Sequence, residues 1–175
     1  MAKAKSSPAQ KRINRALNVS VSNIAVEREL VIFLQDIEDP INVGSLFRTA
    51  DAMQAKLILT GRTPQPPNTE INITSRGLER KVDYEYFEEP QLALDKYKKL
   101  GFQIIALETT TDAILYTQAI YNQKVLLIAG NEKQGVYKKY LEQADLAVFS
   151  PMLGSGPSLN VNVAAAIIAS FIRSA

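Results

Sequence analysis

The stretch PMLGSGPSLNVNVAAAIIAS, residues 151–170, decides the fold, because a loop rich in Gly and Pro turns abruptly into an apolar run. Gly154 and Gly156 permit backbone angles that are closed to other residues, and the two prolines stiffen the loop. The apolar run predicts a helix over 161–173. Capping of that helix does not account for the glycines and prolines before it. We therefore expect the loop to hold a polar small molecule with its backbone amides.

The rest of the chain alternates short apolar runs with helical patterns. The runs at 30–34, 56–60, 102–107, 124–129 and 146–149 predict buried strands, and helices are expected at about 43–54, 91–100, 134–144 and 161–173. This alternation predicts an α/β fold, with a mostly parallel sheet that carries helices on both faces. The segment GRTPQPPNTE, residues 61–70, is expected to be a long loop that its prolines keep extended.

Length and composition fit a globular protein with one core, since the 175 residues are 46 % hydrophobic and 22 % charged. No run approaches a membrane span and no secretory signal opens the chain, so we expect a cytoplasmic protein. Cysteine and histidine are absent, which excludes disulfides, thiolate nucleophiles, cysteine–zinc sites and a Ser-His-Asp triad. We expect no metal. Any chemistry must use the remaining polar groups or a cofactor that brings its own reactivity.

The segment after the first predicted strand, QDIEDPINVGSLFRTADAM, is the second unusual loop. Its proline fixes the entry into a turn, Asn42 is able to cap a helix, and Gly44 lets that helix pack closely on its neighbours. Arg48 falls one turn into the helix and is aimed toward the strand ends. A surface ion pair with Asp51 or with Asp36 is the alternative role for this arginine.

The segment LLIAGNEKQGV follows the predicted strand 124–129. Gly130 comes directly after the strand and leaves room for another group to approach the backbone. Glu132 stands near the start of the next predicted helix, where the helix dipole favours a carboxylate. Gly135 relaxes the turn again. A helix-capping turn without any ligand is the alternative interpretation.

Together, the three loops resemble the motifs of the SpoU/TrmH family of SPOUT methyltransferases, and the similarity runs over about residues 28–173. The first motif is matched by Asn42, Gly44 and Arg48, and the second by Gly130, Glu132 and Gly135. The third is matched by Pro151, Met152, Gly154, Ser158, Leu159, Asn160 and Val161. One such loop is a weak signal, whereas three in this order make the resemblance specific. Asn162 departs from it, because many relatives have serine there.

The resemblance implies an enzyme that transfers a methyl group from S-adenosylmethionine (AdoMet) to a ribose 2′-hydroxyl of tRNA or rRNA. It also implies a C-terminal trefoil knot and a homodimer formed through the C-terminal helix region. The partner subunit would cover the apolar surface of helix 161–172 that the sheet of its own chain does not cover. The alternatives are a non-catalytic RNA-binding dimer on the same scaffold and a SPOUT base N-methyltransferase.

By resemblance, the catalytic residues are Arg48, Asn42, Glu132, Ser158 and Asn160, although the last two are also able to cap the final helix. The cofactor would be held by Ala129, Gly130, Asn131, Gly135, Met152, Gly154, Ser158 and Leu159. Arg48 would deprotonate the hydroxyl or, since a guanidinium stays protonated, lower the hydroxyl pKa or anchor the neighbouring phosphate. We expect Gly130, Gly154 and Arg48 to meet in one cavity, because ligands bind at the carboxyl ends of parallel strands.

We expect residues 1–25 to be a basic, flexible arm and residues 26–175 to be the methyltransferase domain. Net charge is only +2, yet several cations precede the first acidic residue: Lys3, Lys5, Lys11, Arg12 and Arg15. This arm is a candidate for RNA contact, as is the cluster of Arg76, Arg80 and Lys81. Ordinary solvated charge is the alternative for both groups.

Overall fold

The computed structural model describes residues 28–174, so the basic arm predicted for residues 1–25 lies outside the described residues. The elements are, in order, β1 (Glu29–Gln35), α2 (Pro40–Met53), β2 (Lys56–Thr60), α3 (Thr69–Ser75), the 3₁₀ turn η2 (Leu78–Arg80), β3 (Tyr84–Phe87), α4 (Pro90–Lys99), β4 (Gln103–Leu107), β5 (Ile114–Leu115), β6 (Lys124–Ala129), α5 (Lys138–Leu141), β7 (Leu146–Phe149) and α6 (Val161–Ser174).

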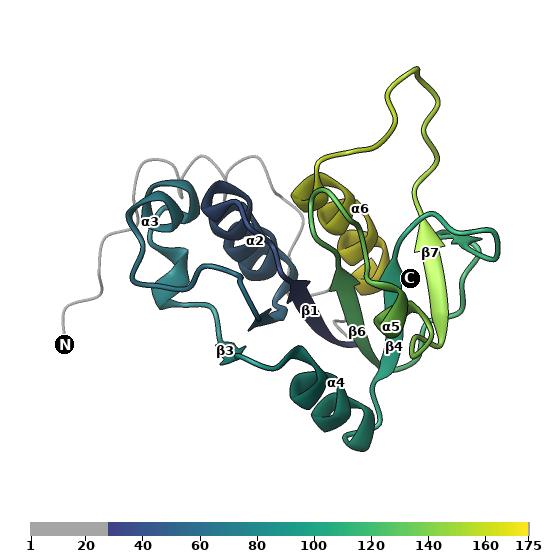
Figure 1. The fold of residues 1–175 in the computed structure, drawn as a ribbon, viewed down its shortest axis with the longest axis horizontal. Helices are drawn as coiled ribbons and strands as arrows, with labels where there is room; N and C mark the ends of the chain where they lie inside the picture. Colours follow the sequence, from purple (N-terminus) through teal and green to yellow (C-terminus); the bar gives the residue numbers. More distant parts are fainter. Residues whose placement is uncertain (1–27, 175) are drawn as a thin grey trace, which may run out of the picture.

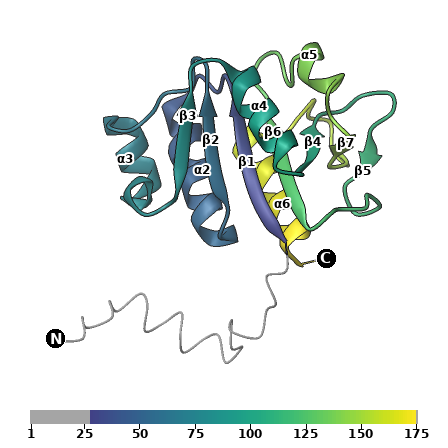
Figure 2. The same cartoon turned by 90° about the horizontal axis from the view of Figure 1, so that it is seen from below.

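The strands form one seven-stranded sheet in the order β3-β2-β1-β6-β4-β7-β5, and Figure 2 shows them side by side in this order. Every strand pair is parallel, which confirms the predicted α/β fold with a parallel sheet. All five predicted strands are present. Sequence analysis missed β3 and β5, which are the two edge strands, and the helix α3. The helix predicted over 134–144 is shortened to α5.

Alternate residues of β1 face two separate cores. Leu30, Ile32 and Leu34 belong to a core shared with α2 and α6, whereas Val31 and Phe33 belong to a core shared with α4 and α5. Figure 1 shows α2 and α6 side by side on one side of the sheet and α4 on the other. The run of apolar residues without polar alternation is therefore explained, because both faces of the strand are covered.

The helix α2 begins at the carboxyl end of β1 and packs closely on α3. Asp39 is its N-cap and accepts a hydrogen bond from the amide of Ile41 at 2.8 Å. A Cβ added at Gly44 would lie 1.8 Å from Oγ1 of Thr74 and 2.8 Å from the carbonyl oxygen of Ile71. Only glycine fits at this helix–helix contact, which confirms the close packing expected at Gly44.

The helix α6 returns from the far side of the sheet to its centre. It follows β7, next to the edge, yet it packs against α2, β1 and β6. The loop 150–160 therefore passes over the carboxyl ends of β4 and β6, and in Figure 1 it projects away from the sheet. The trefoil knot expected in this region stays a prediction.

The buried face of α6 is a narrow stripe formed by Ala165, Ile168, Ala169 and Ile172. Val163 is 44 % exposed, and other apolar side chains of the helix are only partly covered by the described chain. The helix thus carries more apolar surface than the described chain buries. The partner subunit expected to cover this surface stays a prediction.

Arg173, near the end of α6, fastens this helix to the end of α2. Its guanidinium donates to the carbonyl oxygens of Met53 at 2.6 Å and Gln54 at 3.0 Å, and also to that of Arg28. A cation at the C-terminal end of α2 also complements the helix dipole. Burial lowers the pKa of Arg173, but an arginine stays charged at neutral pH.

The Arg173→Met variant tests this fastening, because methionine keeps the aliphatic stem and loses every hydrogen bond. We expect the free energy of unfolding to fall by about 2 kcal/mol, measured by urea denaturation. Lys99→Met, at an exposed position of α4, is the matched control and should change it by less than about 0.5 kcal/mol. Equal stability of the two variants would contradict the role of Arg173.

Candidate active site

A cavity of about 1060 Å³ opens at the carboxyl ends of the central strands. It is bounded by the start of α2, by the residues that follow β4, β6 and β7, and by the end of the loop before α6. Most of the predicted site residues line it, namely Asn42, Gly130, Asn131, Glu132, Gly135, Met152, Ser158, Leu159 and Asn160. Each of the three loops singled out in the sequence therefore contributes to one cavity.

A chain of side-chain hydrogen bonds joins the three loops. Asn160 donates from Nδ2 to Oδ1 of Asn42 at 2.8 Å, and Asn42 donates from its own Nδ2 to Oε1 of Glu132 at 2.9 Å. The carboxylate of Glu132 also accepts from the backbone amides of Glu38 at 3.0 Å and Asp39 at 3.2 Å. These hydrogen bonds fix the orientation of both asparagine side chains, because the NH₂ group of each one donates to a defined oxygen atom.

The carboxylate of Glu132 lies at the start of α2, which corrects the expectation that it lies at the start of the helix after β6. Burial alone would raise the pKa of Glu132, but the hydrogen bonds from Asn42 and from the amides of Glu38 and Asp39 outweigh it and lower the pKa. Glu132 is therefore an anion at neutral pH. Its charge also complements the positive end of the α2 dipole.

The turn after β6 is a tight structure held by its own backbone. Asn131 and Gly135 form an isolated antiparallel bridge, and Oδ1 of Asn131 accepts from the amides of Lys133 at 3.0 Å and Gln134 at 3.1 Å. A Cβ added at Gly130 would lie 2.3 Å from backbone atoms of Gly135 and of the next residue. The chain itself therefore fills the space that a side chain at Gly130 would need, while Gly130 still lines the cavity.

Three predicted site residues do not line the cavity: Ala129, Gly154 and Arg48. Ala129 is the last residue of β6 and is fully buried. Gly154 lies in the exposed part of the loop, with no atom within 4 Å of an added Cβ, and neither it nor Gly156 has a positive φ. The expected use of special backbone angles by these two glycines is therefore wrong for this conformation of the loop.

Arg48 is exposed on α2 and makes no ion pair within residues 28–174, so neither Asp51 nor Asp36 is its partner. It lies one turn beyond Gly44, on the helix face that meets α3. Asn42 points instead toward Glu132 and Asn160. Because the two side chains leave α2 in different directions, a single chain does not bring Arg48 into the cavity, which corrects the expected meeting of Arg48 with Gly130.

Asn162, which departs from the serine of many relatives, links α6 to α2. Its side-chain Oδ1 accepts a hydrogen bond from Oγ1 of the buried Thr49 at 2.8 Å, and its backbone N–H donates to Oδ1 of Asn160 at 2.9 Å. Asn160 thus acts as the N-terminal cap of α6 as well as the partner of Asn42. The side chain of Asn160 therefore makes the expected capping contact, and Asn160 also lines the cavity.

Two buried or half-buried polar residues at strand ends were missed by sequence analysis. Gln35, the last residue of β1, is fully buried, donates to the carbonyl oxygen of Gly135 at 3.2 Å and accepts from the amide of Tyr137 at 2.8 Å. Glu108, just after β4, lines the cavity and accepts from the amide of Val136 at 2.8 Å. The available signal was a polar residue directly after a buried apolar run.

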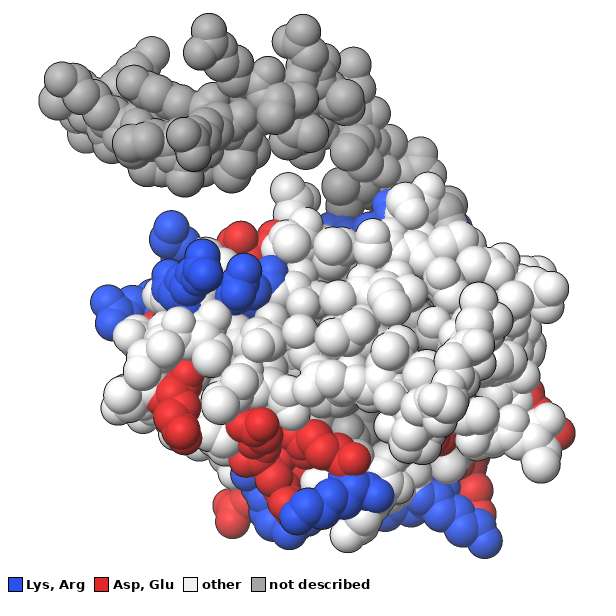
Figure 3. Space-filling view, turned by 90° about the horizontal axis from the view of Figure 1, so that it is seen from above, with Lys and Arg blue, Asp and Glu red and all other residues white. Residues whose placement is uncertain are grey.

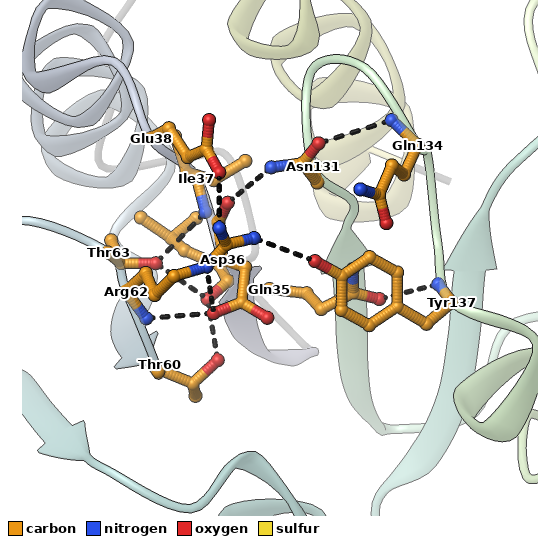
Figure 4. A network of polar contacts seen from close by, with 12 residues as sticks. Gln35, Asp36, Ile37, Glu38, Thr60, Arg62, Thr63, Asn131, Gln134 and Tyr137 are labelled. Atoms are coloured by element: carbon orange, nitrogen blue, oxygen red, sulfur yellow. Dashed lines mark hydrogen bonds and ion pairs between the residues drawn. The ribbon is translucent and has the colours of Figure 1, made fainter.

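Arg62 forms a second polar network beside the cavity (Figure 4). Its guanidinium lies 2.8 Å from Oε1 of Glu38 and 3.3 Å from the hydroxyl of Tyr137, and its amide donates to Oδ1 of Asp36 at 2.8 Å. The network connects the loops that follow β1, β2 and β6. Side-chain contacts therefore connect these three loops to one another.

Within the described part of the chain, no cluster of His, Cys, Asp or Glu residues is arranged to hold a metal ion. The helices of that same part include none that is both long and apolar enough to cross a bilayer.

The sequence pattern of the SpoU rRNA Methylase family matches residues 29–170. The chain belongs to this family. Among curated relatives, the tRNA (guanosine(18)-2'-O)-methyltransferase of Aquifex aeolicus is 30 % identical over 160 residues, covering 91 % of this chain and 74 % of the relative. The 23S rRNA (guanosine(2553)-2'-O)-methyltransferase RlmP of Bacillus subtilis is 30 % identical over 155 residues, covering 82 % of this chain and 57 % of the relative.

Solved structures of SpoU proteins share the fold. The TrmH/SpoU tRNA modifying enzyme of A. aeolicus matches with a TM-score of 0.75 and 27 % identity, over 94 % of this chain and 82 % of that one. An AdoMet-bound rRNA methyltransferase from Sinorhizobium meliloti matches with a TM-score of 0.77 and 25 % identity, over 84 % of this chain and 56 % of that one. The likeness extends over almost all of the described residues.

The Glu132→Gln variant tests the charge at the start of α2. A carboxylate whose pKa is lowered on folding stabilises the fold fully above its unfolded pKa of about 4.3, and this contribution is lost as the pH falls through the folded pKa. We expect the variant to melt below the wild type near pH 7, by an amount equivalent to about 1 kcal/mol, with the difference shrinking below about pH 4. Thermal unfolding followed by circular dichroism measures this.

Glu142→Gln is the matched control, since Glu142 is 64 % exposed and has only an i,i+4 ion pair with Lys138. Its melting temperature should follow that of the wild type within about 2 °C at every pH. A Glu132→Gln difference that grows in acid would contradict the inferred role.

Proposed function

We propose that this SpoU protein is an AdoMet-dependent methyltransferase that modifies a ribose 2′-hydroxyl of tRNA or rRNA. The observation that carries the proposal is the convergence of the three family motifs on one cavity at the carboxyl ends of a parallel sheet. Relatives named as tRNA and as rRNA 2'-O-methyltransferases match at the same identity, 30 %, so they support the reaction without selecting one RNA.

The cavity fits AdoMet in size and in chemistry. Its volume of about 1060 Å³ is ample for a ligand of this size. Leu107, Leu159 and Val161 provide apolar walls for an adenine, and the carboxylate of Glu108 complements the positive charge of the cofactor. When bound, AdoMet supplies a methyl group on a sulfonium, which is a good leaving group. The backbone around Gly130 and Met152 would hold the adenosine.

The polar chain Asn160–Asn42–Glu132 would orient the acceptor ribose. Both asparagines are fixed by their hydrogen bonds and border the cavity, and Glu132 remains charged beside them. Such preorganised dipoles lower the cost of aligning a hydroxyl with a methyl donor. With no histidine in the chain, Arg48 would stabilise the developing alkoxide or anchor the adjacent phosphate.

A homodimer formed through the α6 region would complete the site. Apolar side chains around the start of α2, the loop and α6 are exposed: Ile41 at 49 %, Met152 at 39 %, Leu159 at 36 % and Val163 at 44 %. Burial of this surface against a second copy would remove it from water. A dimer would also account for Arg48, whose own chain does not bring it into the cavity.

The Arg48→Ala variant separates catalysis from cofactor binding. We expect kcat for methyl transfer to fall on the order of 100-fold, because an electrostatic contact to the reacting oxygen is lost. The dissociation constant for AdoMet, measured by calorimetry, should change less than about twofold. Lys99→Ala, on the opposite face of the sheet, is the control and should retain activity. A fully active Arg48→Ala enzyme would refute its assigned role.

The substrate is tested by mass-spectrometric analysis of nucleosides from tRNA and rRNA of cells that lack the protein. Loss of one 2′-O-methylnucleoside, restored by the wild-type gene and not by Arg48→Ala, is the expected outcome. Loss of a base-methylated nucleoside instead would favour a base N-methyltransferase. An unchanged set of nucleosides, together with no AdoMet binding at millimolar concentration, would favour a non-catalytic RNA-binding protein.

A further inference from the structure

A second cavity, of about 540 Å³, lies between the loop after β2 and the turn η2. Its walls are formed mainly by Pro66, Pro67, Asn72, Glu79, Arg80 and Tyr84. The cavity brings together two features that the sequence singled out separately, namely the proline-containing loop 61–70 and the basic segment around Arg80. The proposed methyl transfer uses neither of them.

One wall of this cavity is an aromatic ring held in a fixed position. Tyr84 is half-buried and packs edge-on against Phe47 of α2, with ring centroids 5.4 Å apart and planes at 89°. Pro66 and Pro67 supply rigid apolar surface in the same cavity. A flat, fixed aromatic wall with apolar neighbours is what a nucleobase stacks on, and every base has a face suited to it.

The guanidinium of Arg80 borders the cavity, and the neighbouring carboxylate of Glu79 orients it. Its Nε lies 3.3 Å from Oε1 of Glu79, whose side chain is only 6 % exposed, while the side chain of Arg80 is 78 % exposed. Glu79 is itself fixed by Asn72 at 2.7 Å and by Ser75. The terminal nitrogens of Arg80 have no acceptor within residues 28–174, so they remain available for a phosphate.

Further cations surround this rim. Arg76 and Lys81 are exposed on either side of η2, and Figure 3 shows Lys and Arg side chains gathered over this flank of the molecule, apart from the main group of Asp and Glu. The first cavity, by contrast, is bordered by the carboxylates of Glu38, Glu108 and Glu132. Cations gathered on one flank attract the phosphates of an RNA backbone, so the α3 flank is suited to hold the RNA outside the first cavity.

The elements around the second cavity contact α2, the helix that carries Arg48. Thr74 of α3 contacts Gly44, one turn before Arg48, and Tyr84 contacts Phe47, its direct neighbour in sequence. Both α3 and the wall residue Tyr84 therefore pack against this helix.

We propose that this second cavity binds a nucleotide of the RNA substrate that flanks the methylated one, with its base against Tyr84 and Pro67 and its phosphate on Arg80. The inference rests on the proposed function and adds a place where the RNA is held outside the methyl-transfer site. The volume of about 540 Å³ is sufficient for one base with its ribose.

The test compares Arg80→Gln and Tyr84→Leu with the wild type in methyl transfer to bulk tRNA and rRNA, with labelled AdoMet as donor. We expect KM for RNA to rise roughly tenfold in each variant, since stacking and a phosphate contact are lost. Tyr84→Phe keeps the ring and should stay within about twofold of the wild type. The dissociation constant for AdoMet, measured by calorimetry, should be unchanged in all three.

Two controls separate loss of contact from loss of fold. Lys99→Gln removes an exposed cation from α4, on the other face of the sheet, and should leave KM for RNA unchanged. The salt dependence of RNA binding should weaken by about one phosphate contact in Arg80→Gln and not in Tyr84→Leu. An unchanged KM in both variants, while the wild type methylates RNA, would overturn this inference alone. A wild type that transfers no methyl group to any RNA would overturn the proposed function.

Photocrosslinking gives a readout that does not depend on methyl transfer. A single-stranded RNA of mixed sequence that contains 5-bromouridine is irradiated with the wild-type protein, and the labelled peptide is identified by mass spectrometry. The proposal expects a crosslink to Tyr84 that Arg80→Gln weakens. Crosslinks confined to peptides around the first cavity would contradict it.

Discussion

The candidate site depends on the two hydrogen bonds of the Asn42 side chain. One joins it to Glu132 and the other to Asn160, which lie 90 and 118 residues further along the chain. The amide is nearly buried, so loss of either partner would leave a polar group without compensation. The positions of the turn after β6 and of the start of α6 are therefore coupled through α2, and the cavity exists only where all three meet.

Much of this arrangement could be predicted from the sequence, since apolar runs without alternation identified the buried strands and motif order identified the family. The edge strands β3 and β5 were missed because they are short and only partly buried. The helix α3 was missed because the prolines before it led to the prediction of a loop over 61–70, which overlaps the start of this helix. Local pattern is informative where burial is complete and weak where an element lies at an edge.

The roles of individual residues were harder to predict than the positions of helices and strands. Glycine, for example, has several structural uses that cannot be distinguished in a sequence. Gly44 makes room for α3, and Gly130 makes room for the chain's own turn, so neither needs a ligand to explain it. Arg48 was expected in the cavity because its motif lies there, but the direction in which a side chain leaves a helix depends on helical phase. Gln35 and Glu108 lie in no motif, yet both hold the turn after β6 in place.

The separation of Asn42 from its partners also has a consequence for biosynthesis. The ribosome makes α2 long before it makes Asn160 and α6, so during elongation the side-chain amide of Asn42 and the part of α2 that packs on α6 stay uncovered. Contacts this distant in sequence form slowly, and until they form the half-made domain is a natural client for chaperones. Substrate RNA would thus meet a competent enzyme only after translation has passed α6.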